Sequence, residues 1–428
     1  MASLLIHGGR VLSPEDSLDG EFDILVEDGA IREIAPRITL QGVDEKLDAR
    51  GQVVSPGFVD LHVHLREPGG ENSETLESGL SAAVAGGFTA VCPMPNTDPV
   101  NDSPELTRAM IDKAQRLGLA RVFPIAAVSV HSAGEELTDF AGLVAAGAVA
   151  FSDDGRPVKT AALMKQALEK AQGLAVPVVD HCEDTNLSAG GVMNEGPVSR
   201  RLNLKGIPNS AEEVCIARDL DLAEATGTHL HIAHLSTGRG LEMVRAAKRR
   251  GVRVTCEVTP HHFTLSDETV AECGTNAKMN PPLRSLSDVE ALRAGIADGT
   301  VDALATDHAP HAPELKQKPI ASAPFGVIGL ETALAISLTE LVHPGRISLW
   351  HLISLLSAGP ARVVHKPLGR LRVGGEADIT LFNPQLEWTY QAAQGRSKSR
   401  NSPFDGWKLK GAVTATIVAG KLVYRRPL

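Results

Sequence analysis

The fold is decided by an apolar run that carries two histidines, Gly57-Phe58-Val59-Asp60-Leu61-His62-Val63-His64-Leu65-Arg66. Alternate residues of a β-strand face the same side, so this run predicts a strand that aims the imidazoles of His62 and His64 at one point. Two converging imidazoles are typical ligands of a metal ion. An isolated pair is explained equally well by two ordinary half-buried histidines, so the rest of the chain has to decide.

Three further clusters of ligand-type side chains also end apolar runs. They are Asp153-Asp154, Asp180-His181 and the run Thr306-Asp307-His308-Ala309-Pro310-His311. Core histidines alone would not produce this coincidence, because polar side chains are seldom buried without a partner or a function. The pattern therefore favours a metal site assembled from several strand ends.

The composition is that of a globular protein with an acidic balance. The chain has 428 residues, of which 43% are hydrophobic, and a formal net charge of −10. Binding to nucleic acid or to an anionic membrane would need a basic stripe, which the sequence lacks. The N-terminal residues show no signal-like segment and no stretch approaches membrane-spanning length, so a cytoplasmic protein is expected. Five cysteines without short spacing fit reduced thiols.

From about Ser55 to Leu356 the sequence repeats one pattern, in which a short β-branched run ends in polar residues and an amphipathic helix follows. The expected strands are Gly57–His64, Phe88–Pro93, Arg121–Val128, Ala148–Ser152, Val176–His181, His229–His234, Arg253–Val258 and Val301–Thr306. Eight alternating units predict an α/β fold, the (β/α)8 TIM-type barrel. The alternative, an open doubly wound sheet, would be supported by a glycine-rich nucleotide-binding turn, which is not found.

The two ends of the chain have a different character. Residues 1–54 and 365–428 contain short alternating segments separated by turn residues, which predict β-strands. We expect one small β-sandwich domain formed by both termini, with residues 55–364 forming the metal-dependent barrel. The alternative is two independent decorations of the barrel.

In a (β/α)8 barrel the chemistry lies at the carboxyl ends of the strands. Ligand-type residues are expected there on strands one, four, five, six and eight: His62, His64, Asp153, Asp154, His181, His234 and Asp307. Four imidazoles and two carboxylates exceed the needs of one tetrahedral zinc ion but suit two metals that share a bridging carboxylate. Such ligands without thiolate favour one or two Zn²⁺, with manganese or cobalt as substitutes.

Six motifs give the chain a specific resemblance. They are His62-Val63-His64-Leu65-Arg66-Glu67-Pro68-Gly69, Met94-Pro95-Asn96-Thr97, Phe151-Ser152-Asp153-Asp154-Gly155, Ala233-His234-Leu235-Ser236, Met279-Asn280-Pro281-Pro282-Leu283-Arg284 and Thr306-Asp307-His308-Ala309-Pro310-His311. Together they resemble the amidohydrolase superfamily and, within it, the bacterial type I dihydroorotases. The resemblance covers the whole chain, including the split β-domain.

The resemblance implies a ligand set. His62, His64, Asp154 and Asp307 match the ligands of one metal, His181 and His234 match those of a second, and Asp154 matches the bridge; His234 is assigned mainly in this way. Related hydantoinases and allantoinases carry a carboxylated lysine at the bridge, whereas the nearest lysine here lies beyond the strand end. The choice of Asp154 over Asp153 rests on the resemblance.

The resemblance also implies an activity, the reversible hydrolysis of (S)-dihydroorotate to N-carbamoyl-L-aspartate in pyrimidine (UMP) biosynthesis. Asp307 would be the catalytic residue that carries the proton. A ring carboxylate needs a cationic fork and neutral donors. The implied substrate contacts are Arg66, Asn96, Asn280, His311, Phe325 and Gly326. The last three belong to the stretch from His311 to Gly326, which predicts either a loop that closes over the site or a passive connection.

Two other functions remain open at this point. A related cyclic amidase acting on hydantoin or allantoin would keep the metals without needing the Arg66, Asn96 and His311 set. A non-catalytic partner subunit of aspartate carbamoyltransferase would be expected to lose metal ligands, and this chain retains them all. The expected partners are therefore the small-molecule substrate, a second copy in a homodimer, and aspartate carbamoyltransferase as an active assembly.

Overall fold

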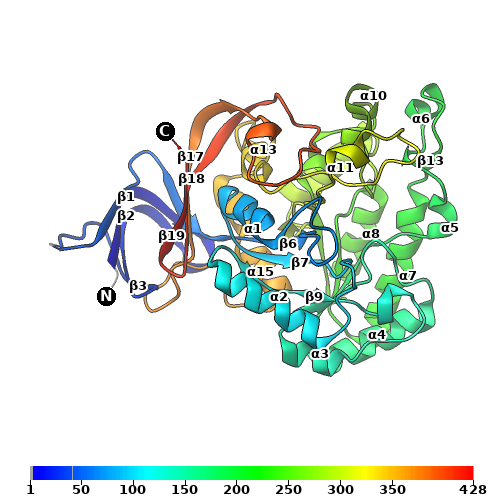
Figure 1. The fold of residues 1–428 in the computed structure, drawn as a ribbon, viewed down its shortest axis with the longest axis horizontal. Helices are drawn as coiled ribbons and strands as arrows, with labels where there is room; N and C mark the ends of the chain where they lie inside the picture. Colours follow the sequence, from blue (N-terminus) through cyan, green and yellow to red (C-terminus); the bar gives the residue numbers. More distant parts are fainter. Residues whose placement is uncertain (1–2, 41, 428) are drawn as a thin grey trace.

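The computed structural model describes residues 3–40 and 42–427, and it confirms the (β/α)8 barrel with a small β-rich part at one end (Figure 1). All eight expected strands are present. They are β6 (Phe58–Val63), β7 (Phe88–Pro93), β8 (Arg121–Val122) continued by β9 (Ile125–Ala126), β10 (Ala150–Phe151), β11 (Val178–Asp180), β14 (Leu230–Ile232), β15 (Val254–Val258) and β16 (Ala303–Leu304). Neighbouring strands pair in parallel, as the alternation with helices predicts.

The third barrel strand is interrupted between β8 and β9. Pro124 has no N–H group to donate, so the ladder breaks at this residue. The two halves stay in register because Phe123 N donates to Val91 O (3.0 Å) on one side and Val149 N donates to Pro124 O (3.0 Å) on the other. The interruption therefore leaves the barrel wall continuous.

The barrel closes between its first and eighth strands. Val63 forms a parallel bridge with His308, and His64 N donates to His308 O at 2.8 Å. Below this point the Asp60 carboxylate accepts hydrogen bonds from Thr306 N (3.1 Å) and Thr306 Oγ1 (2.6 Å). The closure thus holds the strand that carries His62 and His64 directly against the strand that leads to Asp307.

Helices surround the barrel and connect its strands. The longer ones are α1 (Leu76–Ala85), α2 (Pro104–Leu117), α3 (Phe140–Ala146), α4 (Ala161–Gly173), α7 (Ser210–Thr226), α8 (Gly238–Arg249), α11 (Leu286–Ala297), α14 (Leu349–Leu356) and α15 (Ala358–Val363). Shorter elements in the connections are α5 (Thr185–Ser188), β12 (Met193–Asn194), α6 (Pro197–Arg201), β13 (Gly206–Ile207), α9 (Pro260–Thr264), α10 (Thr269–Cys273), α12 (Pro313–Lys316) and α13 (Ala333–Ser337). Within the described residues, no helix combines the length and the apolar character needed to cross a bilayer.

Helix α2 shows how local sequence sets these elements. Ser103 is the N-cap, and its hydroxyl accepts a hydrogen bond from Leu106 N, while Pro104 occupies the first helical position. Gly118 ends the helix with φ +65°, a conformation that favours glycine. Both ends of this helix are therefore specified by single residues.

The two chain ends form one hydrogen-bonded sheet. Its strands are β1 (Ser3–Ser13), β2 (Leu18–Glu27), β3 (Ala30–Ala35), β4 (Glu45–Asp48), β5 (Val53–Pro56), β17 (Ile379–Thr389), β18 (Lys408–Val418) and β19 (Lys421–Arg425), in the order β19-β18-β17-β5-β1-β2-β3 with β4 also on β1. The N-terminal strand β5 lies between β1 and the C-terminal strand β17, and Figure 1 shows the blue and red strands side by side. The ends are therefore not independent decorations.

The junction between this sheet and the barrel is tightly packed. Gly57 connects β5 to β6, and the ring of Phe58 contacts Phe88 (5.9 Å between centroids) in the barrel and Phe382 (6.3 Å) in the terminal sheet. A Cβ atom on Gly57 would lie 2.1 Å from Oγ1 of Thr89. The backbone at Gly57 approaches Thr89 of β7 so closely that this position requires glycine.

We expect Gly57→Ala to lower the free energy of unfolding by about 1–3 kcal/mol, because the added methyl group overpacks the junction. Chemical denaturation monitored by circular dichroism would measure the change. Gly173→Ala is the matched control, since a Cβ there meets no atom within 4 Å and lies in the last turn of α4. Equal stability of the two variants would contradict the proposed constraint.

Candidate active site and metal centre

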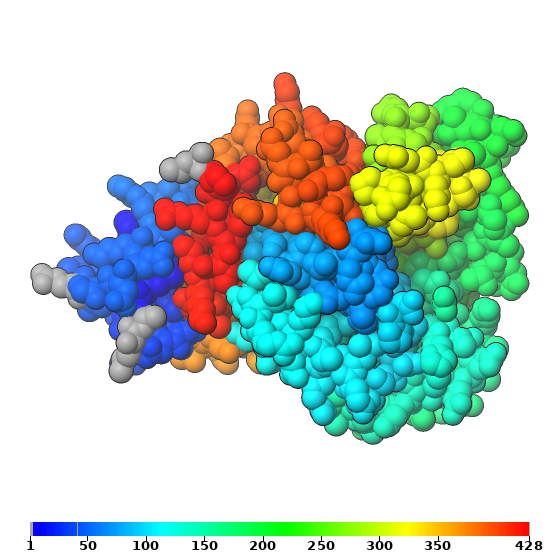
Figure 2. Space-filling view, viewed as in Figure 1, coloured from blue at the N-terminus to red at the C-terminus, as the bar shows by residue number. Residues whose placement is uncertain are grey.

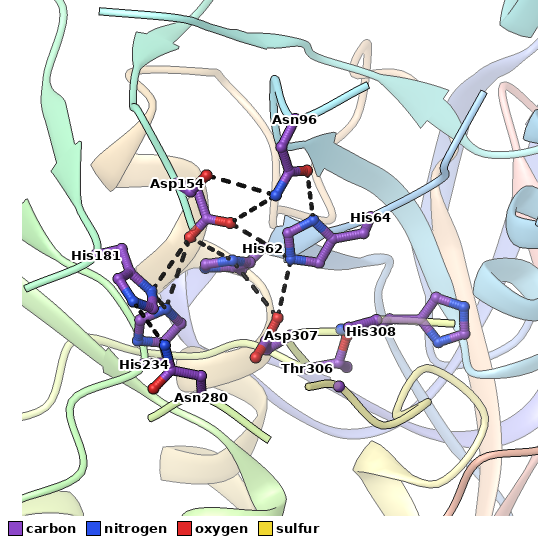
Figure 3. A network of polar contacts seen from close by, with 12 residues as sticks. His62, His64, Asn96, Asp154, His181, His234, Asn280, Thr306, Asp307 and His308 are labelled. Atoms are coloured by element: carbon purple, nitrogen blue, oxygen red, sulfur yellow. Dashed lines mark hydrogen bonds and ion pairs between the residues drawn. The ribbon is translucent and has the colours of Figure 1, made fainter. Parts of the chain in front are cut away.

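The carboxyl ends of the barrel strands surround a cavity of about 340 Å³. All but one of the residues expected to bind metal or substrate line it, and the exception, His62, lies buried just beneath. The cavity is lined by His64, Arg66, Asn96, Asp154, Gly155, His181, His234, Asn280, Asp307, Ala309, His311, Pro324, Phe325 and Gly326. The structure therefore brings together predicted residues that lie far apart in the sequence, several of which are labelled in Figure 3.

Asp154 lies at the centre of the imidazole cluster. Its Oδ1 atom is 3.4 Å from His62 Nε2, 3.6 Å from His181 Nδ1 and 3.7 Å from His234 Nε2, and its Oδ2 atom is 3.6 Å from His64 Nε2. All five side chains are buried. The Asp154 carboxylate thus faces all four histidines, which is the geometry expected of a ligand that bridges two metal ions.

Asp307 extends the same cluster from the eighth strand. Its Oδ1 atom lies 3.1 Å from His64 Nε2 and 3.6 Å from His62 Nε2. On the other side, His181 Nδ1 and His234 Nε2 are only 2.8 Å apart. The six side chains therefore form one cluster, in which Asp154 lies among all four histidines. Their division between two metal ions stays a prediction.

Asp153 faces away from this cluster. Its carboxylate accepts hydrogen bonds from Ser129 N (3.1 Å) and from the Ser129 hydroxyl. The structure thus separates two adjacent aspartates that the sequence alone could not distinguish, and it places Asp154 among the imidazoles.

The outward nitrogens of three histidines are each held by an acceptor. His62 Nδ1 donates to Glu257 (3.1 Å), His64 Nδ1 to Asn96 Oδ1 (2.8 Å) and His181 Nε2 to Glu183 (2.9 Å). An imidazole fixed in this way directs the lone pair of its other nitrogen inward, which is the arrangement that metal-binding histidines use. The chain therefore prepares three nitrogen ligands for a cation.

The charges of the site also fit a cation. Burial alone would raise the pKa of Asp154 and of Asp307, but the interactions of both carboxylates with His62 and His64 hold both pKa values below their ordinary range. Within the described part of the chain, His62 Nε2 and Asp154 Oδ1 are buried atoms without a hydrogen-bond partner. Buried polar atoms normally have one, so these two atoms are oriented for a ligand. The residues therefore fit a bound metal ion.

Three supporting carboxylates were not predicted from the sequence. Glu257, on β15, binds His62 and also lies 3.1 Å from His231 Nε2, and its neighbours lower its pKa to about 2 against the effect of burial. Glu183 follows His181 by two residues, and Asp60 joins the first and eighth strands. For Asp60 and Glu183 the available signal was a carboxylate within, or just after, an apolar strand that carried a predicted ligand. Glu257 lies on the seventh strand, for which no ligand was predicted, so no such signal was available there.

Three residues of the site have left-handed backbone conformations. Arg66, His234 and Asp307 have φ values of +61°, +30° and +46°. Non-glycine residues rarely adopt such values, and they occur mostly where the surrounding structure enforces them for function. The turns at the ends of strands one, six and eight therefore aim these side chains at the cavity.

The predicted substrate residues all line the cavity. Arg66 Nε donates to Pro310 O (3.0 Å), and His311 Nε2 donates to Phe325 O (2.6 Å). Asn96 donates to Asp154 Oδ2 (3.1 Å), and Asn280 donates to Glu183 (2.9 Å). Their contacts with a substrate stay a prediction, but each has a place at the cavity surface.

The stretch from His311 to Gly326 contains the single-turn helix α12 and is held by two buried lysines. Lys278 Nζ donates to Ile320 O and Ala323 O (2.6 Å each), and Lys316 Nζ donates to Pro324 O and Gly326 O (3.0 Å each). The loop therefore rests against the cavity in the described structure. Its closure on substrate stays a prediction, which limited proteolysis with and without dihydroorotate would test.

Known proteins resemble this chain over nearly its whole length. A family model described as Dihydro-orotase-like matches residues 51–239. A dihydroorotase of Syntrophus aciditrophicus is 50% identical over 99% of each chain, and one of Pelobacter propionicus is 51% identical over 99% of this chain and 100% of its own. The chain belongs to the dihydroorotase family. The family predicted from the sequence motifs is thereby confirmed.

Solved structures extend this relationship. The L-hydantoinase (dihydropyrimidinase) of Arthrobacter aurescens aligns with a TM-score of 0.89 and 27% identity, covering 99% of this chain and 96% of its own. A D-hydantoinase aligns with a TM-score of 0.84 at 24% identity, which shows a shared fold. The dihydroorotase-family chain is thus a cyclic amide hydrolase of the amidohydrolase superfamily.

We expect Asp154→Asn to lose most of the bound metal, because the amide removes the negative charge shared by four imidazoles. Asp153→Asn is the matched control, since Asp153 binds Ser129 instead, and it should retain wild-type metal content. Elemental analysis of both purified variants, with circular dichroism to verify folding, measures the difference. Loss of metal only in the Asp153 variant would reverse the assignment.

Proposed function

We propose that this chain is a zinc-dependent dihydroorotase that interconverts (S)-dihydroorotate and N-carbamoyl-L-aspartate in pyrimidine biosynthesis. The observation that carries the proposal is the gathering of four histidines around Asp154 beneath a cavity whose wall contains Arg66. Full-length similarity to dihydroorotases supports the choice of substrate. Imidazole and carboxylate ligands without thiolate support zinc.

His62, His64, Asp154 and Asp307 would hold one ion, and His181, His234 and Asp154 would hold a second. When bound, such ions acidify water at neutral pH and polarise an amide carbonyl. The outward contacts of His62, His64 and His181 keep three of these ligands oriented. The chain therefore contributes histidines in fixed orientations and carboxylates whose negative charge suits a metal ion.

Asp307 is the proposed proton carrier. Its pKa is lowered by the neighbouring imidazoles against the effect of burial, so the carboxylate is ionised at neutral pH and accepts a proton from the attacking water. It then gives this proton to the ring nitrogen as the amide bond breaks. In the ring-closing direction the same carboxylate works in reverse.

Arg66 is the proposed partner of the substrate carboxylate. Burial lowers the pKa of its guanidinium only to about 10, so the group remains charged at neutral pH. Its planar fork suits a carboxylate, and Asn96 and His311 offer neutral groups beside it. A hydantoin ring carries no such carboxylate, so this wall supports dihydroorotate over the substrates of related cyclic amidases.

The proposal extends to the setting of the enzyme. We infer a cytoplasmic protein that acts as a homodimer or as an active subunit joined to aspartate carbamoyltransferase. Because all six ligand-type side chains are present and gathered, a purely scaffolding role in such an assembly is disfavoured. Size measurement of the purified protein, alone and with aspartate carbamoyltransferase, would decide which assembly forms.

Assays of the purified protein with dihydroorotate and with hydantoin test the substrate directly. We expect turnover of dihydroorotate, its loss after chelation, and its return on adding Zn²⁺. Preferential turnover of hydantoin would instead assign a related cyclic amidase.

We expect Asp307→Asn to reduce kcat for dihydroorotate by at least about a hundredfold, because the amide cannot accept the proton. Asp112→Asn, on the exposed face of α2, serves as the control and should retain wild-type kcat. Steady-state kinetics in both reaction directions, with metal content and circular dichroism recorded for each variant, make the comparison. Wild-type turnover by Asp307→Asn would remove its role in proton transfer.

A further inference from the structure

Asn401 connects the C-terminal segment to the loop that follows the eighth barrel strand. It lies between β17 and β18 in the sequence, and only 3% of its surface is exposed. Its Oδ1 atom accepts a hydrogen bond from His311 N (3.1 Å), and its Nδ2 atom donates to Ala309 O and to Gly326 O (3.0 Å each). One amide group therefore ties together the two ends of the loop.

The backbone of Asn401 adds a fourth bond to the same region, because Ile328 N donates to Asn401 O at 2.9 Å. A buried amide is costly unless its donors and acceptor are satisfied. Here every bond of the side chain goes to a backbone group of the loop. Beyond the end of the eighth strand, the Asn401 amide thus pairs with backbone groups that a neighbouring strand would otherwise pair with.

The segment that carries Asn401 is itself fastened to the barrel. The Ser397 hydroxyl and Lys398 N donate to the buried carboxylate of Glu74, and Ser399 Oγ donates to Ser73 O (2.7 Å). Figure 2 shows the orange-red C-terminal residues reaching across the surface to the yellow residues of the loop. Asn401 is therefore presented from a fixed segment.

The residues that Asn401 holds form part of the cavity wall. His311 and Gly326 line the cavity together with Arg66, and Arg66 Nε donates to the carbonyl of Pro310. Gly326 has φ +135°, and a Cβ atom there would lie 2.9 Å from His311 Nε2. Gly326 and His311 therefore lie close together, and small movements of either end of the loop would change their separation.

We propose that Asn401 is a positioning residue for the substrate: it sets the separation of His311 and Gly326 and so shapes the pocket for the ring carboxylate beside Arg66. This inference rests on the proposed dihydroorotase function. It implies that the segment between β17 and β18, two strands of the terminal sheet, also helps to select the substrate. Asn401 does not touch the metal ligands, so its effect falls on substrate binding.

The test compares Asn401→Asp and Asn401→Ala with wild type. The aspartate keeps the acceptor for His311 N but loses both donors and sets a carboxylate oxygen against two carbonyls, whereas alanine loses all three bonds. We expect KM for dihydroorotate to rise by about tenfold in both, with kcat changed by less than about threefold and metal content unchanged. Hydrogen exchange should accelerate in residues 309–328.

Asn383→Asp is the matched control, because this asparagine lies in the C-terminal strand β17 and its Oδ1 atom accepts from the nearby Gln385 N, with no contact to the loop among the described residues. It should keep wild-type KM. An unchanged KM in a folded Asn401 variant, or a fall in kcat without a rise in KM, would overturn the inference. If the alanine variant does not fold, the aspartate variant decides. Failure of the proposed function is distinguished because wild type itself would then not turn over dihydroorotate.

Discussion

The structure depends on the burial of two carboxylates, Asp154 and Asp307, among four imidazoles. Burial of a negative charge is unfavourable unless positive charge compensates it nearby. The carboxylates and the imidazoles come from the ends of five different strands, so the closed barrel is needed to bring them together. A cation held by these residues would supply positive charge beside the two carboxylates.

A second layer of acceptors makes this cluster specific for a cation. Glu257, Asn96 and Glu183 each bind the outward nitrogen of one histidine, which leaves the inward nitrogen free to act as a ligand. Glu257 lies on strand seven, and Asn96 and Glu183 lie in the loops after strands two and five. Almost every strand therefore contributes either a ligand or the group that orients one, and the barrel and the metal centre are parts of the same construction.

Much of this could be predicted from the sequence, because local periodicity reports strands and helices and because His62 and His64 share one face of a strand. The Ser103 cap and all eight barrel strands follow from such local signals. The orientation of Asp153 and Asp154 could not be predicted, since it depends on Ser129 from a neighbouring strand end. Asn401 also gave no signal, because its partners lie far away in the chain and a lone asparagine usually indicates a turn.

The position of β5 between β1 and β17 has a consequence for biosynthesis. The first barrel strand directly follows β5 in the sequence. One edge of β5, however, pairs with β17, which is near the C-terminus. During translation that edge stays open while almost the entire barrel emerges from the ribosome. Unpaired edges recruit strands from other chains. A stalled or prematurely terminated polypeptide would thus expose the unpaired edge of β5, which can pair with strands of other chains. Degradation of incomplete chains is therefore important for this architecture.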